Sequence, residues 1–236
     1  MTKYFITFGA GGNNFYEAGK RLINQAEKLE LFDKIIFYTD KDLKNDIDFW
    51  KQHSTFIENN KRGYGYYIWK SYIIKKTMEK MKDNDILLHL DAGCEIDIRE
   101  KEDMIKYLEL IKTNYIIGTD LCNEKDWTKM DLILKLDMLD DKYLNSHQRQ
   151  GGANLFLICD KTRNLVNEWY ELGCDYHNID DSPSIVPNIV TFREHRHDQS
   201  IFSLLTKKYN LYSSISLYNC KCIHSNRNKT GVSQLK

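Results

Sequence analysis

Hydrophobic and polar positions follow two alternating periods along the first half of the chain. Short apolar runs that stop at glycine or aspartate, such as YFITFG (residues 4–9) and KIIFYT (34–39), are typical of buried strands. Between them, apolar residues recur three and four positions apart from Phe15 to Leu29, which indicates one face of a helix. Strands that alternate with helices predict a largely parallel sheet with crossover helices on its faces.

The same pattern predicts the remaining elements. We expect further strands over residues 85–90, 115–118, 151–158 and 212–218, and helices over 69–81, 103–111, 161–172 and 199–207. The segment 175–190 is rich in Asp, Ser and Pro and predicts a loop. The expected fold class is therefore α/β: one domain with a Rossmann-like, mainly parallel twisted sheet flanked by helices.

Composition and charge exclude several classes of protein. Lys+Arg and Asp+Glu number 34 each, so no global field recruits nucleic acid. The six cysteines form no CxxC pair, which argues against a zinc ribbon or a disulfide framework. The start of the chain has no signal-peptide pattern, and no run approaches the roughly 18 apolar residues of a membrane span. We therefore expect a reduced cytoplasmic protein, with peripheral membrane attachment left open by its many Tyr and Trp.

The strongest chemical signal is an acidic turn after an apolar strand. The run over 85–90 delivers Asp91 directly into a turn that contains Gly93. Open parallel sheets bind ligands at the carboxyl ends of their strands. A carboxylate there can hold a divalent cation that bridges a diphosphate, and Gly93 lets the backbone approach closely. The alternative is that Asp91 only caps the following turn.

Two segments carry a resemblance to a known family. GYGYYIWKSYIIKKTMEKMKDNDILLHLDAGCEI (63–96) and HRHDQSIFSLL (195–205) resemble a group of bacterial and viral GT-A glycosyltransferases that act on surface polysaccharides. The resemblance implies a single GT-A-like domain over 1–236, with a nucleotide-binding half (1–120) and an acceptor-side half (121–236) that ends in a C-terminal lid. It implies transfer of a hexose from a nucleotide diphosphate sugar, with UDP favoured over GDP, to a glycan or other hydroxyl acceptor.

The resemblance also implies a metal, Mn²⁺ or Mg²⁺. In such enzymes an Asp-x-Asp motif binds the metal and the donor diphosphate, and Asp91 falls on its first aspartate. Gly93 stands in the place of the second aspartate, so the paired carboxylates are incomplete. We expect the metal on Asp91 with His224 as the first choice of partner; Glu95, Asp97 or the donor itself are the alternative sources of the missing ligand.

The HDQS segment resembles the Asp-Gln pair of retaining GT-A enzymes of the glycogenin and lipopolysaccharide galactosyltransferase type. There the pair lies at the anomeric face of the donor sugar. The resemblance implies that Asp198 binds sugar hydroxyls or the acceptor, and that Gln199 stabilises an oxocarbenium-like transition state with retention of configuration. The alternative is that Asp198 is the N-cap of the helix that follows.

Basic, aromatic and small residues complete the expected donor site. Lys70 begins a helix, where an ammonium and the positive helix end together favour a phosphate, and Arg62 is a weaker candidate of the same kind. Tyr64, Tyr66 and Tyr67 are candidates for stacking on a base, although such aromatics are commonly core. The expected donor-binding residues are Phe8, Gly9, Ala10, Thr39, Asp40, Arg62, Lys70, Asp91, Ala92, Gly93, Gly151, Gly152, Arg227 and Lys229.

Two other functions are open at this stage. A sugar-nucleotide nucleotidyltransferase would carry basic residues in a Gly-rich N-terminal segment. Residues 9–12 of this chain are Gly-rich, but the nearest basic residues that follow, Lys20 and Arg21, lie on the predicted helix. A non-catalytic sugar-binding module would have little reason to combine Asp91, Lys70 and the Asp-Gln pair. Trp127 and Lys129 are candidates for the acceptor side, but a surface loop is the favoured interpretation of both.

Overall fold

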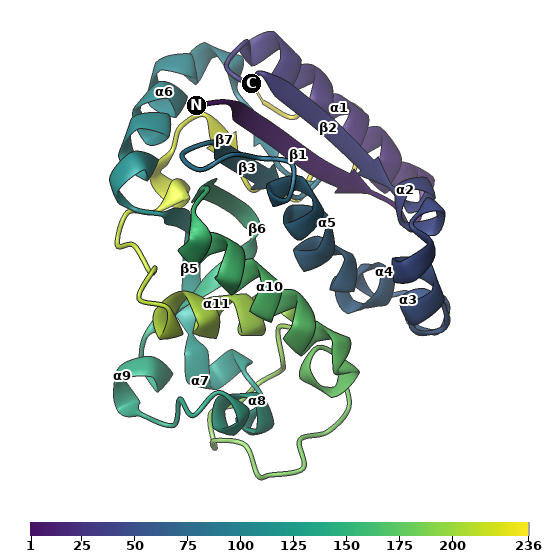
Figure 1. The fold of residues 1–236 in the computed structure, drawn as a ribbon, viewed down its shortest axis with the longest axis vertical. Helices are drawn as coiled ribbons and strands as arrows, with labels where there is room; N and C mark the ends of the chain where they lie inside the picture. Colours follow the sequence, from purple (N-terminus) through teal and green to yellow (C-terminus); the bar gives the residue numbers. More distant parts are fainter. Residues whose placement is uncertain (236) are drawn as a thin grey trace.

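The structure, a computed structural model, describes residues 1–235; Lys236, the last residue of the expected lid, lies outside the described residues. Its centre is a five-stranded sheet in the order β2-β1-β3-β6-β5 (Figure 1). The strands are β1 (Lys3–Gly9), β2 (Lys34–Thr39), β3 (Ile86–Leu90), β5 (Ile116–Asn123) and β6 (His147–Leu157).

Strand directions refine the prediction. β1 pairs parallel with both β2 and β3, whereas β6 pairs antiparallel with β3 on one side and β5 on the other. The predicted α/β fold with a helix-flanked sheet is confirmed, and the sheet is mixed because β6 runs against its neighbours. Strands from both predicted halves of the chain share this one sheet.

Helices cover both faces of the sheet. α1 (Asn13–Leu29) and α6 (Lys101–Leu110) bury their apolar residues on the face that carries Phe5 and Leu88. α5 (Ile68–Met78), α10 (Asp160–Cys174) and α11 (Asp198–Lys208) cover the opposite face. Neighbouring strand residues point to opposite faces, so each side of the sheet has its own core.

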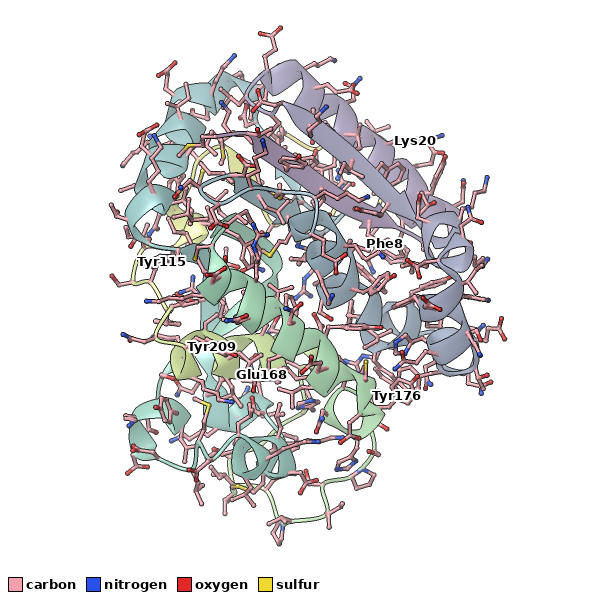
Figure 2. All side chains as sticks on the ribbon, in the orientation of Figure 1. Phe8, Lys20, Tyr115, Glu168, Tyr176 and Tyr209 are labelled. Carbon is pink, nitrogen blue, oxygen red and sulfur yellow. The ribbon has the colours of Figure 1, made fainter. Side chains whose placement is uncertain are left out.

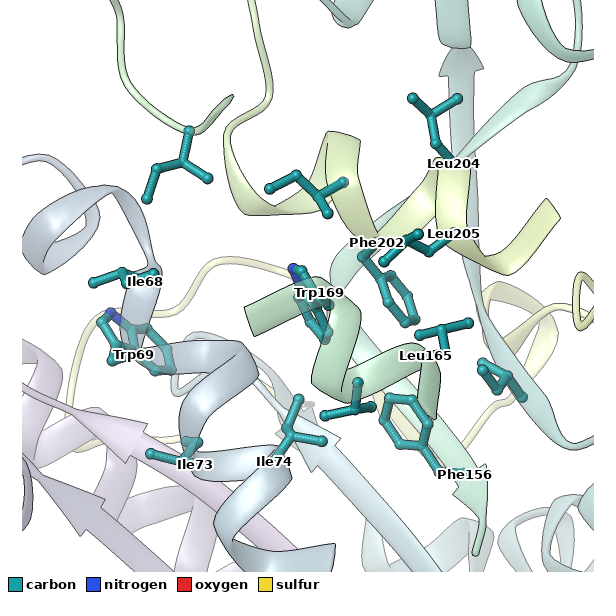
Figure 3. Close-up of a cluster of buried hydrophobic side chains, with 14 of the residues drawn as sticks. Ile68, Trp69, Ile73, Ile74, Phe156, Leu165, Trp169, Phe202, Leu204 and Leu205 are labelled. Atoms are coloured by element: carbon teal, nitrogen blue, oxygen red, sulfur yellow. The ribbon is translucent and has the colours of Figure 1, made fainter. Parts of the chain in front are cut away.

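The core on the second face fixes three helices relative to one another (Figure 3). Trp169 of α10 and Phe202 of α11 lie with ring centroids 4.6 Å apart, and both are fully buried. Ile73 and Ile74 of α5 join the same cluster. Fully burying a side chain such as Phe202 contributes about 1.5–3 kcal/mol, so these three helices have little freedom to move apart.

Shorter elements connect the layers. They are α2 (Asp40–Asn45), α3 (Ile47–Asn59), α4 (Gly63–Tyr66), α7 (Glu124–Trp127), α8 (Met130–Lys135), α9 (Asp141–Leu144), the strands β4 (Glu95–Ile96) and β7 (Ile223–His224), and the 3₁₀ turns Ile98–Glu100, Ile111–Thr113, Tyr176–Asn178 and Leu217–Asn219. After α11, Tyr209 donates a hydrogen bond to Glu168 of α10, at 2.7 Å (Figure 2). Within residues 1–235, no helix combines the length and apolar character that crossing a bilayer requires.

The predicted strand over 212–218 is wrong. Ser216 forms only an isolated bridge with Gly118, and its hydroxyl accepts from the backbone of Tyr218 to start a 3₁₀ turn. The ring of Tyr212 packs 4.5 Å from the guanidinium of Arg149, so the apolar alternation reflects packing on neighbouring elements. The last strand of the described chain is β7, which pairs antiparallel with β4.

Candidate active site

Three charged side chains meet at the carboxyl end of β3. Lys70 Nζ lies 3.0 Å and 3.3 Å from the two carboxylate oxygens of Asp91 and 3.9 Å from Asp198 Oδ2. The side chains of Lys70 and Asp198 are only 4% and 6% exposed, whereas that of Asp91 is 39% exposed. A ligand therefore reaches this cluster through Asp91. The structure brings together the expected phosphate-binding lysine, the motif aspartate and the aspartate of the Asp-Gln pair.

Two glycines on β6 leave the room around this cluster. A Cβ on Gly152 would lie 3.1 Å from Asp91 Oδ2, and a Cβ on Gly151 would lie 3.3 Å from both Lys70 Nζ and Asp198 Oδ2. The Asp91 N–H donates to the carbonyl of Gly152 at 2.7 Å, which continues the β3–β6 pairing into the turn. A side chain at either position would press on these charged groups, so glycine leaves them room to stay where they are.

Gln199 is held beside the charged cluster. Its Oε1 accepts from the Gly151 N–H at 3.2 Å, and its Nε2 donates to Gln148 Oε1 at 2.6 Å. The carbonyl of Asp198 accepts from the buried indole of Trp169 at 2.9 Å. His197, not Asp198, is the N-cap residue of α11, and no side-chain bond closes the cap. The capping alternative for Asp198 therefore does not apply.

Strained backbone precedes two of these site residues. Tyr64, Tyr66 and Tyr67, just before Lys70, have φ of 54°, 49° and 66°, and His197, just before Asp198, has φ 56°. Such left-handed conformations cost about 1–3 kcal/mol each for a residue with a side chain, and they gather at functional sites. The rings of Tyr66 and His197 lie 5.0 Å apart, and His197 Nδ1–H donates to the Ile179 carbonyl at 2.7 Å. The two strained segments thus pack on each other at the cluster.

Burial and charge set the protonation of the cluster. Burial raises the pKa of the Asp198 carboxyl to about 7; the charge of Lys70 opposes this rise and that of Asp91 adds to it. Burial alone would lower the pKa of the Lys70 ammonium, but the charges of Asp91 and Asp198 raise it above its ordinary value. At neutral pH the cluster therefore holds a permanent cation beside a carboxyl group that gains and loses its proton.

His89 belongs to the site and was missed from the sequence. It is fully buried, its Nε2 lies 3.8 Å from Asp91 Oδ1, and neither ring nitrogen has a hydrogen-bond partner. Burial, with the nearby charge of Lys70, lowers its pKa well below the ordinary value, so the ring is neutral. The signal was present: His89 is the lone polar residue in ILLHL and shares a strand face with Asp91, two positions on.

Five of the expected donor-binding residues, numbers 8 to 10 and 39 to 40, lie at the ends of β1 and β2. Phe8 is 5% exposed and its ring stacks on that of Trp69, with centroids 4.0 Å apart; Trp69 precedes Lys70 in the chain. A Cβ on Gly9 would lie 2.9 Å from the ring of Phe37. Ala10 is partly buried against the same core. Phe8 and Gly9 are thus packing residues, and Phe8 reaches the site through Trp69.

Residues at the end of β2 are engaged locally. Thr39 is the N-cap of α2, and its backbone N–H donates to Asp42 at 2.7 Å. Asp40 forms an ion pair with Lys44 at 2.7 Å, and its side chain is 36% exposed. Any contact of Asp40 with a ligand would compete with that exposed pair, which itself contributes little to stability.

The remaining basic candidates lie in two places: Arg62 beside the loop before α11, and Arg227 and Lys229 on the C-terminal tail. Arg62 is paired with Asp181 at 3.2 Å and with Glu194 at 3.8 Å, so it ties the strained tyrosine segment to the loop before α11. Arg227 is exposed, and its Cα lies against Gly93, next to Asp91. Lys229 is exposed and lies 5.4 Å from the ring of Phe15.

Arg21 clamps the C-terminal tail to the Asp91 turn. Its buried guanidinium donates to the carbonyls of Ala92 and Cys94, at 2.9 and 2.7 Å, and of Asn228 and Thr230, at 3.1 and 2.6 Å. The tail expected to act as a lid is therefore docked on the site. Its sequence signal was only a basic residue on a helix.

The expected metal ligands are not assembled. Glu95 accepts hydrogen bonds from Ser233 Oγ and the Gln234 N–H, at 2.7 and 2.9 Å, and Asp97 pairs with Arg99 at 2.6 Å. His224 pairs with Glu95 through the β4–β7 backbone, and its buried Nε2 has no hydrogen-bond partner. Among residues 1–235, no three His, Cys, Asp or Glu side chains gather where they could hold a metal ion. The residues present therefore do not fit the implied Mn²⁺ or Mg²⁺.

The candidates for the acceptor side have structural partners. Lys129 is 4% exposed at its side chain, and its ammonium donates to the His177 carbonyl and to Asp180, both at 3.0 Å. The surface-loop interpretation of Lys129 is wrong because the lysine is buried and fixes the loop after α10. The guanidinium of Arg196 lies 4.0 Å from the ring of Trp127.

Comparisons with known proteins give distant structural likenesses. No family model matches the chain, and no curated protein matches it. The crystal structure of mouse xyloside xylosyltransferase 1, in its apo form, is 12% identical, with a TM-score of 0.45 over 91% of this chain and 85% of that one. The galactosyltransferase LgtC, solved in complex with donor and acceptor sugar analogs, is 15% identical, with a TM-score of 0.40 over 87% and 70%.

The raised pKa of Asp198 predicts a pH-dependent stability that Asp198→Asn removes. Its folded pKa, about 7, exceeds its ordinary value of 3.8, so the stabilising protonated form is fully present below about pH 4. That contribution is lost as the pH rises through 7. The melting temperature of the wild type, relative to that of Asp198→Asn, should fall by at least about 4 °C between pH 4 and 8.

The measurement is a melting curve at pH intervals for both proteins. Glu124, whose pKa burial also raises to about 7, is present in both and cancels in the difference. Curves that run parallel from pH 4 to 8 would show that the Asp198 carboxyl is not the group that titrates.

Proposed function

We propose that the chain is a glycosyltransferase that transfers a sugar from a nucleotide diphosphate sugar to a hydroxyl acceptor. The observation that carries the proposal is the convergence of Lys70, Asp91, Asp198 and Gln199 around two glycines at the carboxyl end of β3. Ligands of α/β sheets bind at this edge. The resemblance of segments 63–96 and 195–205 to GT-A glycosyltransferases supports it.

Each side chain has a role that its position supports. The half-exposed Asp91 accepts hydrogen bonds from the donor sugar, with Lys70 beneath it and close to the leaving diphosphate. Asp198 contacts sugar or acceptor hydroxyls. The Gln199 Oε1 accepts one hydrogen bond, from the Gly151 N–H, so the negative end of this amide dipole has a second lone pair with which to stabilise positive charge at the anomeric carbon. In this assignment Asp91, Asp198 and Gln199 all contact the reacting sugar, and Asp198 and Gln199 lie at its anomeric face.

The finer parts of the proposal follow the sequence. We favour a UDP-hexose as donor, a glycan as acceptor, and retention of configuration, because a neutral amide rather than a committed nucleophile adjoins the cluster. A cytoplasmic location, with or without peripheral membrane attachment, stays a prediction.

Specific contacts disfavour the two other functions. A nucleotidyltransferase needs free basic groups at its Gly-rich segment, but the Arg21 guanidinium is used by four backbone carbonyls and Lys20 pairs with Glu17 on the outer side of α1. A non-catalytic sugar-binding module has no use for a buried lysine held between two carboxylates.

A thermal-shift panel tests the proposal. UDP, GDP, UTP, GTP and the corresponding nucleotide sugars are added separately, each with EDTA or with MnCl₂. A ligand that binds only the folded chain at 100 times its Kd stabilises it by about 2.7 kcal/mol, so UDP or GDP and their sugars should raise the melting temperature.

The other outcomes discriminate between functions. A shift with nucleoside triphosphates alone would favour the nucleotidyltransferase, and no shift with any nucleotide would favour the sugar-binding module. The donor that gives the largest shift is then incubated with the protein, and NMR of the released sugar reports its identity and anomer together.

A further inference from the structure

The place of a second motif carboxylate is closed in this chain. A Cβ on Gly93 would lie 3.3 Å from the Cα of Arg227 and 3.5 Å from its carbonyl carbon. The Asn228 N–H also donates to the Gly93 carbonyl at 2.9 Å, so the tail backbone is bonded to this position. A side chain at residue 93 would press on the tail backbone, which would have to shift to admit its Cβ. Gly93 is thus part of a packed arrangement, with the tail where the side chain would extend.

The carboxylates that could compensate are occupied. Glu95 is 0% exposed and turned toward the tail, where it also lies 3.9 Å from Arg21 Nε. Asp97 is held by the Arg99 guanidinium. Neither can join Asp91 unless these bonds break and the β4–β7 pair opens.

The ammonium of Lys70 already fills the space between the two site carboxylates. It lies within 3.0–3.9 Å of oxygens of Asp91 and Asp198, and 5.0 Å from the ring of Tyr67. A divalent cation on the same oxygens would face this fixed like charge at contact distance, in surroundings where charges interact strongly. Lys70 lies in the first turn of α5, directly after the left-handed residues Tyr66 and Tyr67, and this backbone fixes the position of its side chain.

We propose that this site uses the chain's own cations, Lys70 beneath the donor and Arg227 on the docked tail, in place of a divalent metal ion. The inference rests on the proposed function, since it concerns how the leaving nucleotide is stabilised. During transfer the bond between the anomeric carbon and the β-phosphate oxygen breaks, and its electron pair leaves with that oxygen. The acceptor oxygen bonds to the anomeric carbon and gives up its proton, which the departing phosphate accepts. Lys70 and Arg227 offset the negative charge that grows on the phosphate.

The first test is isothermal titration of the wild-type protein with UDP, once in EDTA and once in MnCl₂. The expected result is that the two dissociation constants agree within about twofold. Binding that is at least about tenfold tighter with Mn²⁺ than in EDTA would overturn the inference but leave the glycosyltransferase proposal standing. If UDP, GDP and their sugars bind in neither buffer, the proposed function fails, and the inference fails with it.

The second test separates Lys70 from other lysines of α5. Lys70→Met should weaken UDP binding in EDTA by about tenfold or more, as loss of a charged hydrogen bond predicts. Lys75→Met is the matched control: it removes a partly exposed lysine of the same helix that pairs with Glu79, and UDP binding should stay unchanged. Lys70→Arg keeps the charge and should bind UDP better than Lys70→Met. Equal UDP affinity of Lys70→Met and wild type would overturn the assignment.

A spectroscopic measurement decides the case even if Lys70→Met does not fold. The electron paramagnetic resonance signal of free Mn²⁺ should stay undiminished when wild-type protein is added in excess. When UDP is present as well, the signal should fall no further than UDP lowers it without protein. A stoichiometric loss of that signal on addition of protein would show a metal site and overturn the inference.

Discussion

Replacing Asp91 by Asn (Asp91→Asn) is expected to lower the rate of sugar transfer by about 10³-fold, the scale of losing a preorganised charge at a reacting centre. Asp91 is the most exposed member of the charged cluster, and its carboxylate makes two of the three contacts between the Lys70 ammonium and carboxylate oxygens. Asparagine keeps the shape but removes the charge. Lys70 would then turn toward Asp198, and the donor would meet an N–H donor in place of one of the two charged acceptor oxygens.

The rate is measured as product formed per enzyme under saturating donor, by NMR or chromatography. Asp83→Asn is the control, because Asp83 precedes the other end of the same strand and pairs on the surface with Arg163. Asp83→Asn should keep the wild-type melting temperature within a few degrees, because it removes an exposed pair. Asp91→Asn removes a partner of the buried Lys70, so its melting temperature is measured first and the rate is compared below it. Transfer at the wild-type rate by Asp91→Asn would remove Asp91 from the active site.

The first half of the fold is predictable because its strands and helices obey simple periods. The boundaries of β1, α1 and β2 follow directly from the positions of apolar residues. α3 was missed because its buried face includes His53, which sequence patterns count as polar. In the structure His53 is fully buried, with its two ring nitrogens bonded to the hydroxyls of Tyr170 and Tyr176, both at 2.9 Å. A core histidine satisfied by distant tyrosines leaves no local signal.

The direction of a strand could not be predicted from the sequence either, because it also depends on parts of the chain that show no local pattern. An apolar run such as GGANLFLI predicts a strand but not whether it runs with or against its neighbours. The direction of β6 depends on the short helices α7 to α9, which return the chain from the end of β5. Those helices have four to six residues each, too few to show a helical period.

In the candidate site, too, single residues are predictable from the sequence, whereas their contacts with one another are not. The motifs predicted Lys70, Asp91, Asp198 and Gln199 one by one, and the fold brings them to one place. Their mutual contacts are set by three helices packed around Trp169, so no local pattern could show that Lys70 bridges Asp91 and Asp198. The metal prediction depended on a motif whose second position is Gly93, and only the position of the tail shows why glycine is there.

Gln199→Ala is expected to lower the turnover number about 10²-fold while the dissociation constant of UDP changes less than about threefold. The Gln199 amide is fixed by the Gly151 N–H on one side and Gln148 on the other, so its dipole has one orientation before the donor arrives. A preorganised dipole stabilises charge that develops only in the transition state, which is why turnover should fall more than UDP binding.

Two comparisons make this prediction sharp. Gln52→Ala removes an exposed glutamine of α3 far along the chain from the Asp-Gln pair and should leave both constants unchanged. Gln199→Glu keeps the length of the side chain but replaces the Nε2 donor to Gln148 with a charged oxygen, so it should recover little of the turnover. If Gln199→Ala instead weakens UDP binding and turnover equally, the amide contributes to donor binding alone. An unchanged turnover number would return Gln199 to a purely structural role, in which it joins β6 to the start of α11.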